Sequence, residues 1–137
     1  MSENSGLVSK DKKYKDCIFC NLPSSRILDE SEYFLVIRDM YPVTKMHSLI
    51  ISKRHVENIF DLIEKELIDM NSFILKTKIN LENLDTSISG FNIGTNVGKS
   101  AGQTIFHFHM HIIPRRDGDA ENSRGGVRGV ISEKQDY

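Results

Sequence analysis

Three histidines at strict period two are the residues of this chain best suited to chemistry. His107, His109 and His111 alternate with apolar residues over the range 106–112. Successive side chains of a strand point to opposite faces, so the three imidazoles are expected to share one face and to span about 13 Å. Near neutral pH an imidazole can act as a nucleophile or as a metal ligand. The spacing favours a catalytic role for the three histidines on the floor of an active site. One alternative is that they only mark the solvent-facing side of a half-buried strand, and the second is that they form a metal centre.

The elements around this strand predict an α+β fold with a mainly antiparallel sheet. Short strands are expected at 27–28, 33–37, 48–52, 91–95 and 104–113, the last of them ended by Pro114. One long helix is expected over 58–84, and its predicted buried stripe consists of Ile63, Leu67, Ile68, Met70, Ile74, Leu75 and Ile79. One helix between two groups of strands does not fit regular βαβ winding.

Length and charge limit the class of protein. A chain of 137 residues suits one domain, expected over 17–116, with a flexible lead at 1–16 and a polar, glycine-rich, solvated tail at 117–137. A net charge of −1 argues against nucleic-acid binding. No apolar run approaches the roughly 20 residues that span a bilayer, so no membrane partner is expected. The polar residues 1–16 do not resemble a secretory signal, and the location is expected to be cytoplasmic.

The two cysteines of the chain, Cys17 and Cys20, form a CxxC motif. A structural disulfide is not expected in a reducing cytosol. The spacing suits half of a zinc site or a redox pair. A thioredoxin-like role is the weaker interpretation, because there the motif opens a helix within a βαβ unit.

The segment around the histidines resembles the signature of the histidine-triad (HIT) family of nucleotide hydrolases and transferases. That signature alternates three histidines with apolar residues, as the range 102–115 does here. The similarity extends to 45–55, where Met46 and Ser52 replace a usual glycine and proline, and to the segments at 17–20 and 39–42. The resemblance implies a HIT-like fold with one sheet and one long helix, assembled as a twofold homodimer.

The resemblance also implies roles for individual residues. His109 would be the nucleophile, and the other groups around the reacting phosphate would be His107, His111, His47 and Gln103. The substrate would be held by Asn96 and Thr104 on phosphate oxygens, by Asp39 on the ribose hydroxyls, and by Ile18, Phe19, Ile37 and Met40 on the base.

Similarity to zinc-bearing members of the family implies a ligand set of Cys17, Cys20, His55 and His107. Four protein ligands leave no open position, so such a zinc would be structural. Two buried thiols without metal are the alternative. No organic cofactor is expected.

The implied reaction is hydrolysis at the α-phosphate of a nucleoside phosphoramidate or dinucleoside polyphosphate, with a purine nucleotide as the substrate. Attack by a neutral imidazole gives a nucleotidyl-histidine, which splits one difficult displacement into two easier ones and releases a nucleoside monophosphate. The transferases that this chain resembles usually carry glutamine at the third triad position, so His111 favours hydrolysis. A non-catalytic nucleotide-binding module is the alternative from another class, and the intact triad argues against it.

Overall fold

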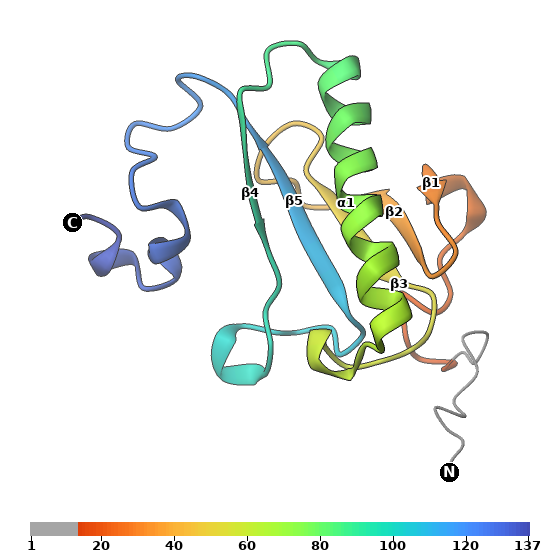
Figure 1. Ribbon diagram of the computed structural model, residues 1–137. Helices are drawn as coiled ribbons and strands as arrows, with labels where there is room; N and C mark the ends of the chain where they lie inside the picture. Colours follow the sequence, from red (N-terminus) through yellow and green to blue (C-terminus); the bar gives the residue numbers. More distant parts are fainter. Residues whose placement is uncertain (1–13) are drawn as a thin grey trace.

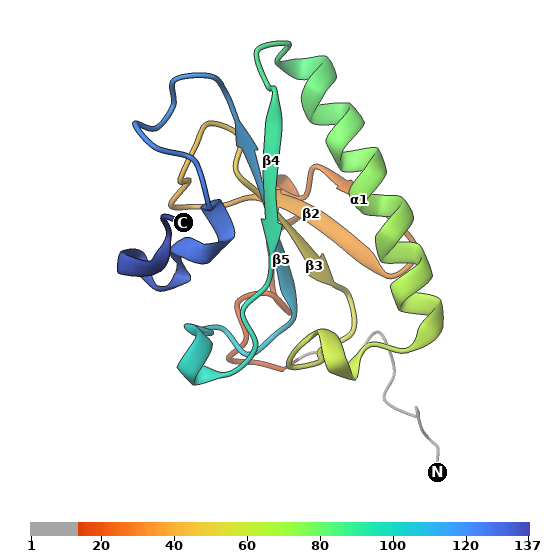
Figure 2. The same cartoon turned by 60° about the vertical axis from the view of Figure 1, so that its left-hand side comes forward.

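Five antiparallel strands form one sheet in the computed structural model, which describes residues 14–137. The strands are β1 (Asp29–Glu30), β2 (Phe34–Arg38), β3 (Ser48–Ser52), β4 (Gly90–Gly94) and β5 (His109–Arg115), in the spatial order β1-β2-β3-β5-β4. One helix, α1 (Glu64–Leu84), lies across the sheet (Figure 1). Figure 2 shows α1 and the C-terminal segment 117–137 on opposite sides of the sheet. The predicted α+β class, with an antiparallel sheet and one long helix, is confirmed.

The two faces of the sheet have different neighbours. Met110 and Ile112 of β5 are buried in the core that α1 covers, while His109 and His111 alternate with them and face the other side. All five residues of β3 are buried, because it lies between β2 and β5 and is covered on both faces. The core under α1 contains Phe34, Val36, Ile50, Phe73, Leu81, Phe108, Met110 and Ile112.

The predicted bounds of the last strand are wrong at both ends. β5 begins at His109 rather than Thr104, because His107 leaves the strand and its buried side chain points to the two cysteines. The strand also continues through Pro114 to Arg115. The carbonyl of Pro114 faces the β3 side, and in a strand the backbone nitrogen of a residue points to the same side as its carbonyl. Strand pairing with β3 has already ended there, at Ile112. The proline therefore costs no ladder hydrogen bond.

Two further boundaries differ from the expectation. A strand was expected at 27–28, but the first strand, β1, is formed by the next two residues, Asp29 and Glu30. The segment before α1 begins with a 3-10 turn (Ile59–Asp61) that the Asn58 side chain caps, so the helix starts at Glu64 rather than at residue 58. The other 3-10 turns are Ser24–Arg26, Lys99–Ala101, Gly126–Val130 and Ser132–Lys134.

The buried face of α1 is not the predicted apolar stripe. Its buried residues are Glu66, Met70, Phe73, Thr77 and Leu81. Of the predicted set, Met70 is buried and Ile74 packs partly against the core, whereas Ile63, Leu67, Ile68, Leu75 and Ile79 are exposed. A pattern of apolar residues alone misses this face, because two of its five positions are polar.

Glu66 can be buried at the start of α1 because both oxygens of its carboxylate accept hydrogen bonds. The Arg54 guanidinium donates to both carboxylate oxygens, at 2.7 and 3.0 Å, and the Ile63 N–H donates to one of them at 2.9 Å. The Glu66 side chain is 2% exposed and the Arg54 side chain 12%. The pair therefore ties the loop after β3 to the first turn of the helix.

Replacing Arg54 with methionine is expected to lower the free energy of unfolding by about 3 kcal/mol, because it leaves the Glu66 charge buried without a partner. Urea denaturation measures the change. Lys78→Met, which breaks the exposed pair with Glu82, is the matched control and should change stability by less than about 0.5 kcal/mol. Equal effects of the two variants would contradict the role given to the buried pair.

The C-terminal segment folds back along β4 and β5 and carries two 3-10 turns (Figure 1). Nearly all residues of 117–137 are exposed, as expected of a solvated tail, but the segment has a defined fold. The expected flexible lead, 1–16, lies outside the described residues except for 14–16. Within residues 14–137, no helix has the length and apolar character needed to cross a membrane.

Candidate active site

His109 and His111 face a cavity of about 450 Å³ on the side of the sheet opposite α1. The register of β3 with β5 places Ile51 beside His109 and Leu49 beside His111, which gives the imidazoles an apolar floor. His47, on the turn just before β3, completes the group of histidines around the cavity. The structure brings to the same cavity all seven residues predicted to hold substrate: Ile18, Phe19, Ile37, Asp39, Met40, Asn96 and Thr104.

The His109 imidazole is held at one nitrogen and open at the other. Its Nδ1 lies 2.9 Å from the backbone carbonyl oxygen of His107, which can only accept a hydrogen bond. The neutral ring therefore carries its proton on Nδ1, and Nε2 keeps its lone pair. Within residues 14–137, Nε2 has no hydrogen-bond partner. The edge of the Phe19 ring, 5.0 Å away between centroids, limits the motion of the imidazole.

A chain of hydrogen bonds fixes the protons on His47 and His111. The backbone N–H of Val43 donates to Nδ1 of His47 at 3.0 Å, so neutral His47 carries its proton on Nε2. That Nε2 lies 2.9 Å from Nδ1 of His111, which must accept. Burial lowers the pKa of both rings, so both are neutral at pH 7. The proton of His111 therefore resides on Nε2.

Asp39 lies beside this histidine pair, and the three residues have the spacing of a cation site. Its Oδ2 is 3.5 Å from Nε2 of His47 and 3.9 Å from Nδ1 of His111. A metal ligand needs an unprotonated nitrogen, however, and the Val43 N–H keeps the proton of His47 on the very atom that faces Asp39. The arrangement fits a hydrogen-bonded group better than a metal centre.

Two residues predicted to act at the phosphate do not line the cavity. Gln103 is 4% exposed, and its amide donates to the carbonyls of Glu57 and Ile105 and accepts from the N–H of Gly98. These contacts brace the loop before β5 and leave no donor directed at a substrate. His107 points away from the cavity, toward the cysteines. For both residues, the structure supports a positioning role.

The cavity also contains residues that the sequence analysis missed. They are Arg26, Tyr41, Val43, Leu49, Gly102 and Ile105. Arg26 is the one cation among them, and it also donates to the carbonyl of Arg38 at 3.1 Å. The local sequence does not distinguish Arg26 from an ordinary surface arginine. Arg26 contacts Arg38 at the end of β2, and the pairing of β2 with β3 brings that end close to the histidines.

A second cluster is formed by Cys17, Cys20, His55 and His107. Nδ1 of His107 is 3.3 Å from Sγ of Cys17, 3.5 Å from Sγ of Cys20 and 3.1 Å from Nδ1 of His55. The other ring nitrogen of His107, Nε2, lies 2.7 Å from the carbonyl oxygen of Ser52. The Ser52 carbonyl therefore holds the proton on Nε2, and the lone pair of Nδ1 is directed into the cluster.

This donor set fits zinc. Two thiols and two imidazoles within 4.8 Å of one another match the Cys₂His₂ composition of structural zinc sites. Bond lengths of 2.0–2.3 Å around a tetrahedral ion give ligand separations of about 3.3–3.8 Å, close to the distances found here. Burial lowers the pKa of His107 to about 4 and also lowers that of His55, so both rings are the neutral imidazoles that zinc binds.

The cluster and the cavity are physically joined. His107 belongs to the cluster, and its own carbonyl orients His109. Phe19, between the two cysteines, presents its ring to both His107 and His109. The Asn21 amide closes the CxxC turn by donating to the carbonyl of Cys17 at 2.7 Å.

Comparison with known proteins gives a consistent result. The HIT domain family matches residues 22–118. A solved HIT family hydrolase from Clostridium thermocellum is 33% identical with a TM-score of 0.62, covering 77% of this chain and 96% of that one. A Zn-bound histidine triad family protein from Mycobacterium smegmatis is 35% identical with a TM-score of 0.69, covering 78% and 80%. A hypothetical histidine triad nucleotide-binding protein from Sulfolobus tokodaii is 34% identical with a TM-score of 0.67, covering 74% and 70%.

Proposed function

Because this chain belongs to the HIT family, we propose that it is a nucleotide hydrolase in which His109 attacks the phosphorus next to a nucleoside. One observation carries the proposal. Nδ1 of His109 is bound to a backbone carbonyl, while Nε2 is left without a partner among the described residues, in a cavity with the seven candidate substrate-binding residues. A ring with its nucleophilic atom open and its tautomer fixed is prepared for covalent catalysis.

In the first step, the Nε2 lone pair of His109 forms a bond to phosphorus. The bond from phosphorus to the leaving group breaks, and its electron pair departs with the leaving group. The departing amine or phosphate takes up a proton from solvent, and the Nε2–H of His111 donates a hydrogen bond to it as the bond breaks. His47 donates to Nδ1 of His111 and so helps to keep that proton on the side of the phosphate.

In the second step, water attacks the phosphorus of the nucleotidyl-histidine. One water proton goes to solvent, the bond from phosphorus to His109 breaks with its electron pair returning to Nε2 of His109, and a nucleoside monophosphate is released. Asn96 and Thr104 border the cavity near the histidines and are assigned to the phosphoryl oxygens, and Asp39 to the ribose hydroxyls. Apolar side chains including Phe19 and Ile37 form the slot for a purine base.

The proposal includes a structural zinc bound by Cys17, Cys20, His55 and His107. The Mycobacterium smegmatis protein described above as Zn-bound supports this assignment, together with the donor set of the cluster. The ion would fix His107, whose carbonyl holds the nucleophile, and the CxxC turn, whose Phe19 borders the cavity. A closed set of four ligands offers no position for substrate.

Turnover by the unaltered protein tests the proposal. A fluorogenic adenosine phosphoramidate should be hydrolysed to adenosine monophosphate, and quenching in alkaline denaturant during turnover should trap an acid-labile nucleotide adduct on His109, detectable by mass spectrometry. Transfer of the nucleotide to a second phosphorylated acceptor in preference to water would favour the transferase. Binding of adenosine monophosphate without turnover would favour the non-catalytic module.

We propose in addition that the chain forms a twofold homodimer through α1. Leu67, Ile68, Leu75 and Ile79 are 41–63% exposed, so one face of the helix leaves apolar area open to water. Sedimentation at micromolar concentration should show twice the 15.7 kDa mass of the chain. Ile68→Asp places a charge on this face and should give the monomer. A single 15.7 kDa species of the unaltered protein would rule the dimer out.

A further inference from the structure

A separate cavity, of about 340 Å³, is bordered by the last two turns of α1 and by residues of β1 and β2. Its apolar walls are Leu28, Val36, Leu81 and Leu84. Val36 and Leu81 belong to the core on the α1 side of the sheet, whereas the histidine cavity lies on the other side. The two cavities share no lining residue. We call this one the helix cavity.

Arg38, at the end of β2, brings a cation without a counter-charge to this cavity. Its Nη1 donates to Oγ of Ser48 at 3.0 Å, and within residues 14–137 the guanidinium has no other hydrogen bond and no carboxylate partner. The side chain is partly buried, and this burial lowers its pKa, because the charged form is less well solvated there. A guanidinium with unused N–H groups, partly shielded from water, favours a bound anion.

Three more polar side chains of the lining have no hydrogen-bond partner within the part of the chain that the structure describes. They are Thr77, Asn80 and Asn83, all in α1. Thr77 is 4% exposed, and its hydroxyl is the one buried side-chain polar atom among residues 14–137 that lacks a partner. A buried hydroxyl without a hydrogen bond lowers the free energy of unfolding. A ligand with oxygen acceptors would offer partners to these donors.

Asp29, the one carboxylate of the lining, limits the charge that a ligand can carry. Its Oδ2 lies 3.0 Å from Nζ of Lys76, so Asp29 already has a counter-charge and Arg38 supplies the one free positive charge. A carboxylate carries one negative charge and can accept two parallel hydrogen bonds from a guanidinium. A phosphate monoester carries nearly two negative charges at pH 7 and would be repelled more strongly by Asp29. The charges of the helix cavity therefore favour a carboxylate.

We propose that the helix cavity binds a small monocarboxylate with an apolar body, the carboxylate on Arg38 and the body against the leucines of the wall. Leu28 and Leu84 are 52% and 69% exposed, so a bound chain would cover apolar area that now faces water. The inference goes beyond the hydrolase function and does not depend on it. Arg26 of the histidine cavity donates to the carbonyl of Arg38, so the two sites meet at the end of β2 but lie on opposite faces of the sheet. A nucleotide and a carboxylate can therefore be bound at the same time.

Titration of the isotope-labelled protein with hexanoate, followed by NMR, tests this assignment. The Nε–H signal of Arg38 and the backbone signals of β2 and of the last two turns of α1 should shift saturably, with a Kd of about 1 mM or below. Hexanoate should bind at least about tenfold more tightly than acetate, which lacks the chain, and than hexanamide, which lacks the charge. Saturating adenosine monophosphate should not displace it. Equal affinities for hexanoate and hexanamide, or displacement by adenosine monophosphate, would overturn the proposal.

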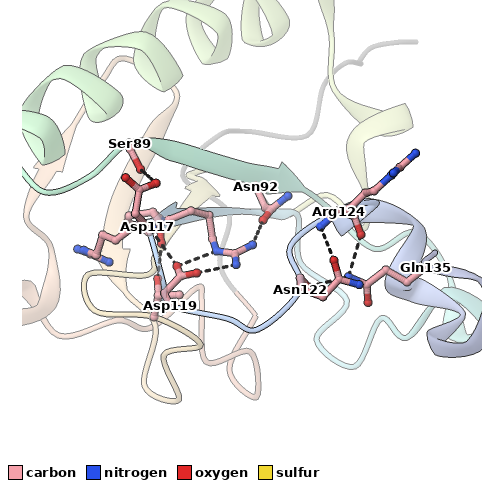
Figure 3. A network of polar contacts seen from close by, with 11 residues as sticks. Ser89, Asn92, Asp117, Asp119, Asn122, Arg124 and Gln135 are labelled. Atoms are coloured by element: carbon pink, nitrogen blue, oxygen red, sulfur yellow. Dashed lines mark hydrogen bonds and ion pairs between the residues drawn. The ribbon is translucent and has the colours of Figure 1, made fainter. Parts of the chain in front are cut away.

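Removing the cation provides a sharper test. Arg38→Met keeps an apolar stem in the cavity, so the Kd for hexanoate should rise at least about tenfold. Arg124→Met is the matched control. Figure 3 shows Arg124 in the C-terminal segment, where its backbone takes part in the polar network and its guanidinium does not. That guanidinium also lacks a carboxylate partner within residues 14–137, but it is exposed and lies on the side of the sheet opposite α1. Its removal should change the Kd by less than about twofold, and equal losses in the two variants would contradict the proposal.

A variant that leaves Arg38 in place tests the charge argument independently. Asp29→Asn removes the negative charge from the lining, so hexanoate should bind several-fold more tightly and hexyl phosphate should gain more, because it carries more negative charge. Glu82→Gln is the matched control, because Glu82 pairs with Lys78 at 3.1 Å on the same stretch of α1 but does not line the cavity. It should change neither Kd by more than about twofold. Equal effects of the two variants, or no effect of Asp29→Asn, would mean that the helix cavity does not select an anion.

Discussion

Single-turnover hydrolysis of an adenosine phosphoramidate by His109→Ala is expected to be at least about a thousandfold slower than by the unaltered protein. The variant removes the one imidazole nitrogen that is both unprotonated and open to the cavity. His111 cannot replace it, because its Nδ1 accepts from His47 and its Nε2 carries the proton. His47 cannot replace it either, since its Nδ1 accepts from the Val43 N–H.

A binding measurement distinguishes loss of the nucleophile from loss of the nucleotide-binding site. Calorimetry with adenosine monophosphate should give a Kd for His109→Ala within a few-fold of the unaltered protein, because Phe19, Ile37 and Asp39 remain in place. No nucleotide adduct should be trapped on the variant. Near-native turnover by His109→Ala would show that the nucleophile is wrongly assigned, and a metal-activated water would become the better explanation.

The alternation of β5 is the part of the site that sequence predicts best, because side chains on a strand change face at every residue. His109 and His111 share a face as expected, with Met110 and Ile112 in the core behind them. His107 departs from the pattern, since its contacts with Cys17 and Cys20 come from a segment some ninety residues away in sequence. Strand periodicity is a local property and cannot anticipate such a contact.

Sequence periodicity predicts neither the buried face of α1 nor the fold of the C-terminal segment, and the reasons are related. Glu66 is buried because Arg54 pairs with it, so the buried stripe contains a charge that apolar periodicity assigns to solvent. The C-terminal segment has few apolar residues and no period. Its placement depends on the contacts of Arg115 with Asp119 and Asn92 and on Gly126, which lies against Asn92. The contacts with Asn92 exist only after β4 and β5 have formed.

Met46 shows a departure from the family pattern that the fold absorbs. Its φ is +69°, the single positive value at a residue other than glycine among residues 14–137. The turn before β3 thus keeps the left-handed conformation that a glycine commonly provides, and His47 still reaches the cavity. The methionine side chain packs partly against the core, which offsets some of the backbone strain.

Loss of a zinc ligand is expected to have the second large effect, on stability more than on chemistry. Protein purified without added metal should contain about one zinc per chain, and His55→Ala should contain much less. The melting temperature of His55→Ala should fall by about 10 °C or more, which for a domain of this size corresponds to about 3 kcal/mol. His55 does not line the histidine cavity, so catalysis by the fraction that stays folded should be affected less than by His109→Ala.

Cys20→Ser gives a nearly isosteric companion variant, because it removes a thiolate ligand without opening space in the buried turn. Its zinc content and its melting temperature should both fall, as those of His55→Ala do. Removing the metal by chelation should lower the melting temperature of the unaltered protein to nearly that of the variants and leave the variants unchanged. The reason is that folding energy from a structural zinc is available only when all of its ligands are present. Metal-free protein that is fully folded and equally stable to heat would mean that the two thiols and two imidazoles are simply buried neighbours.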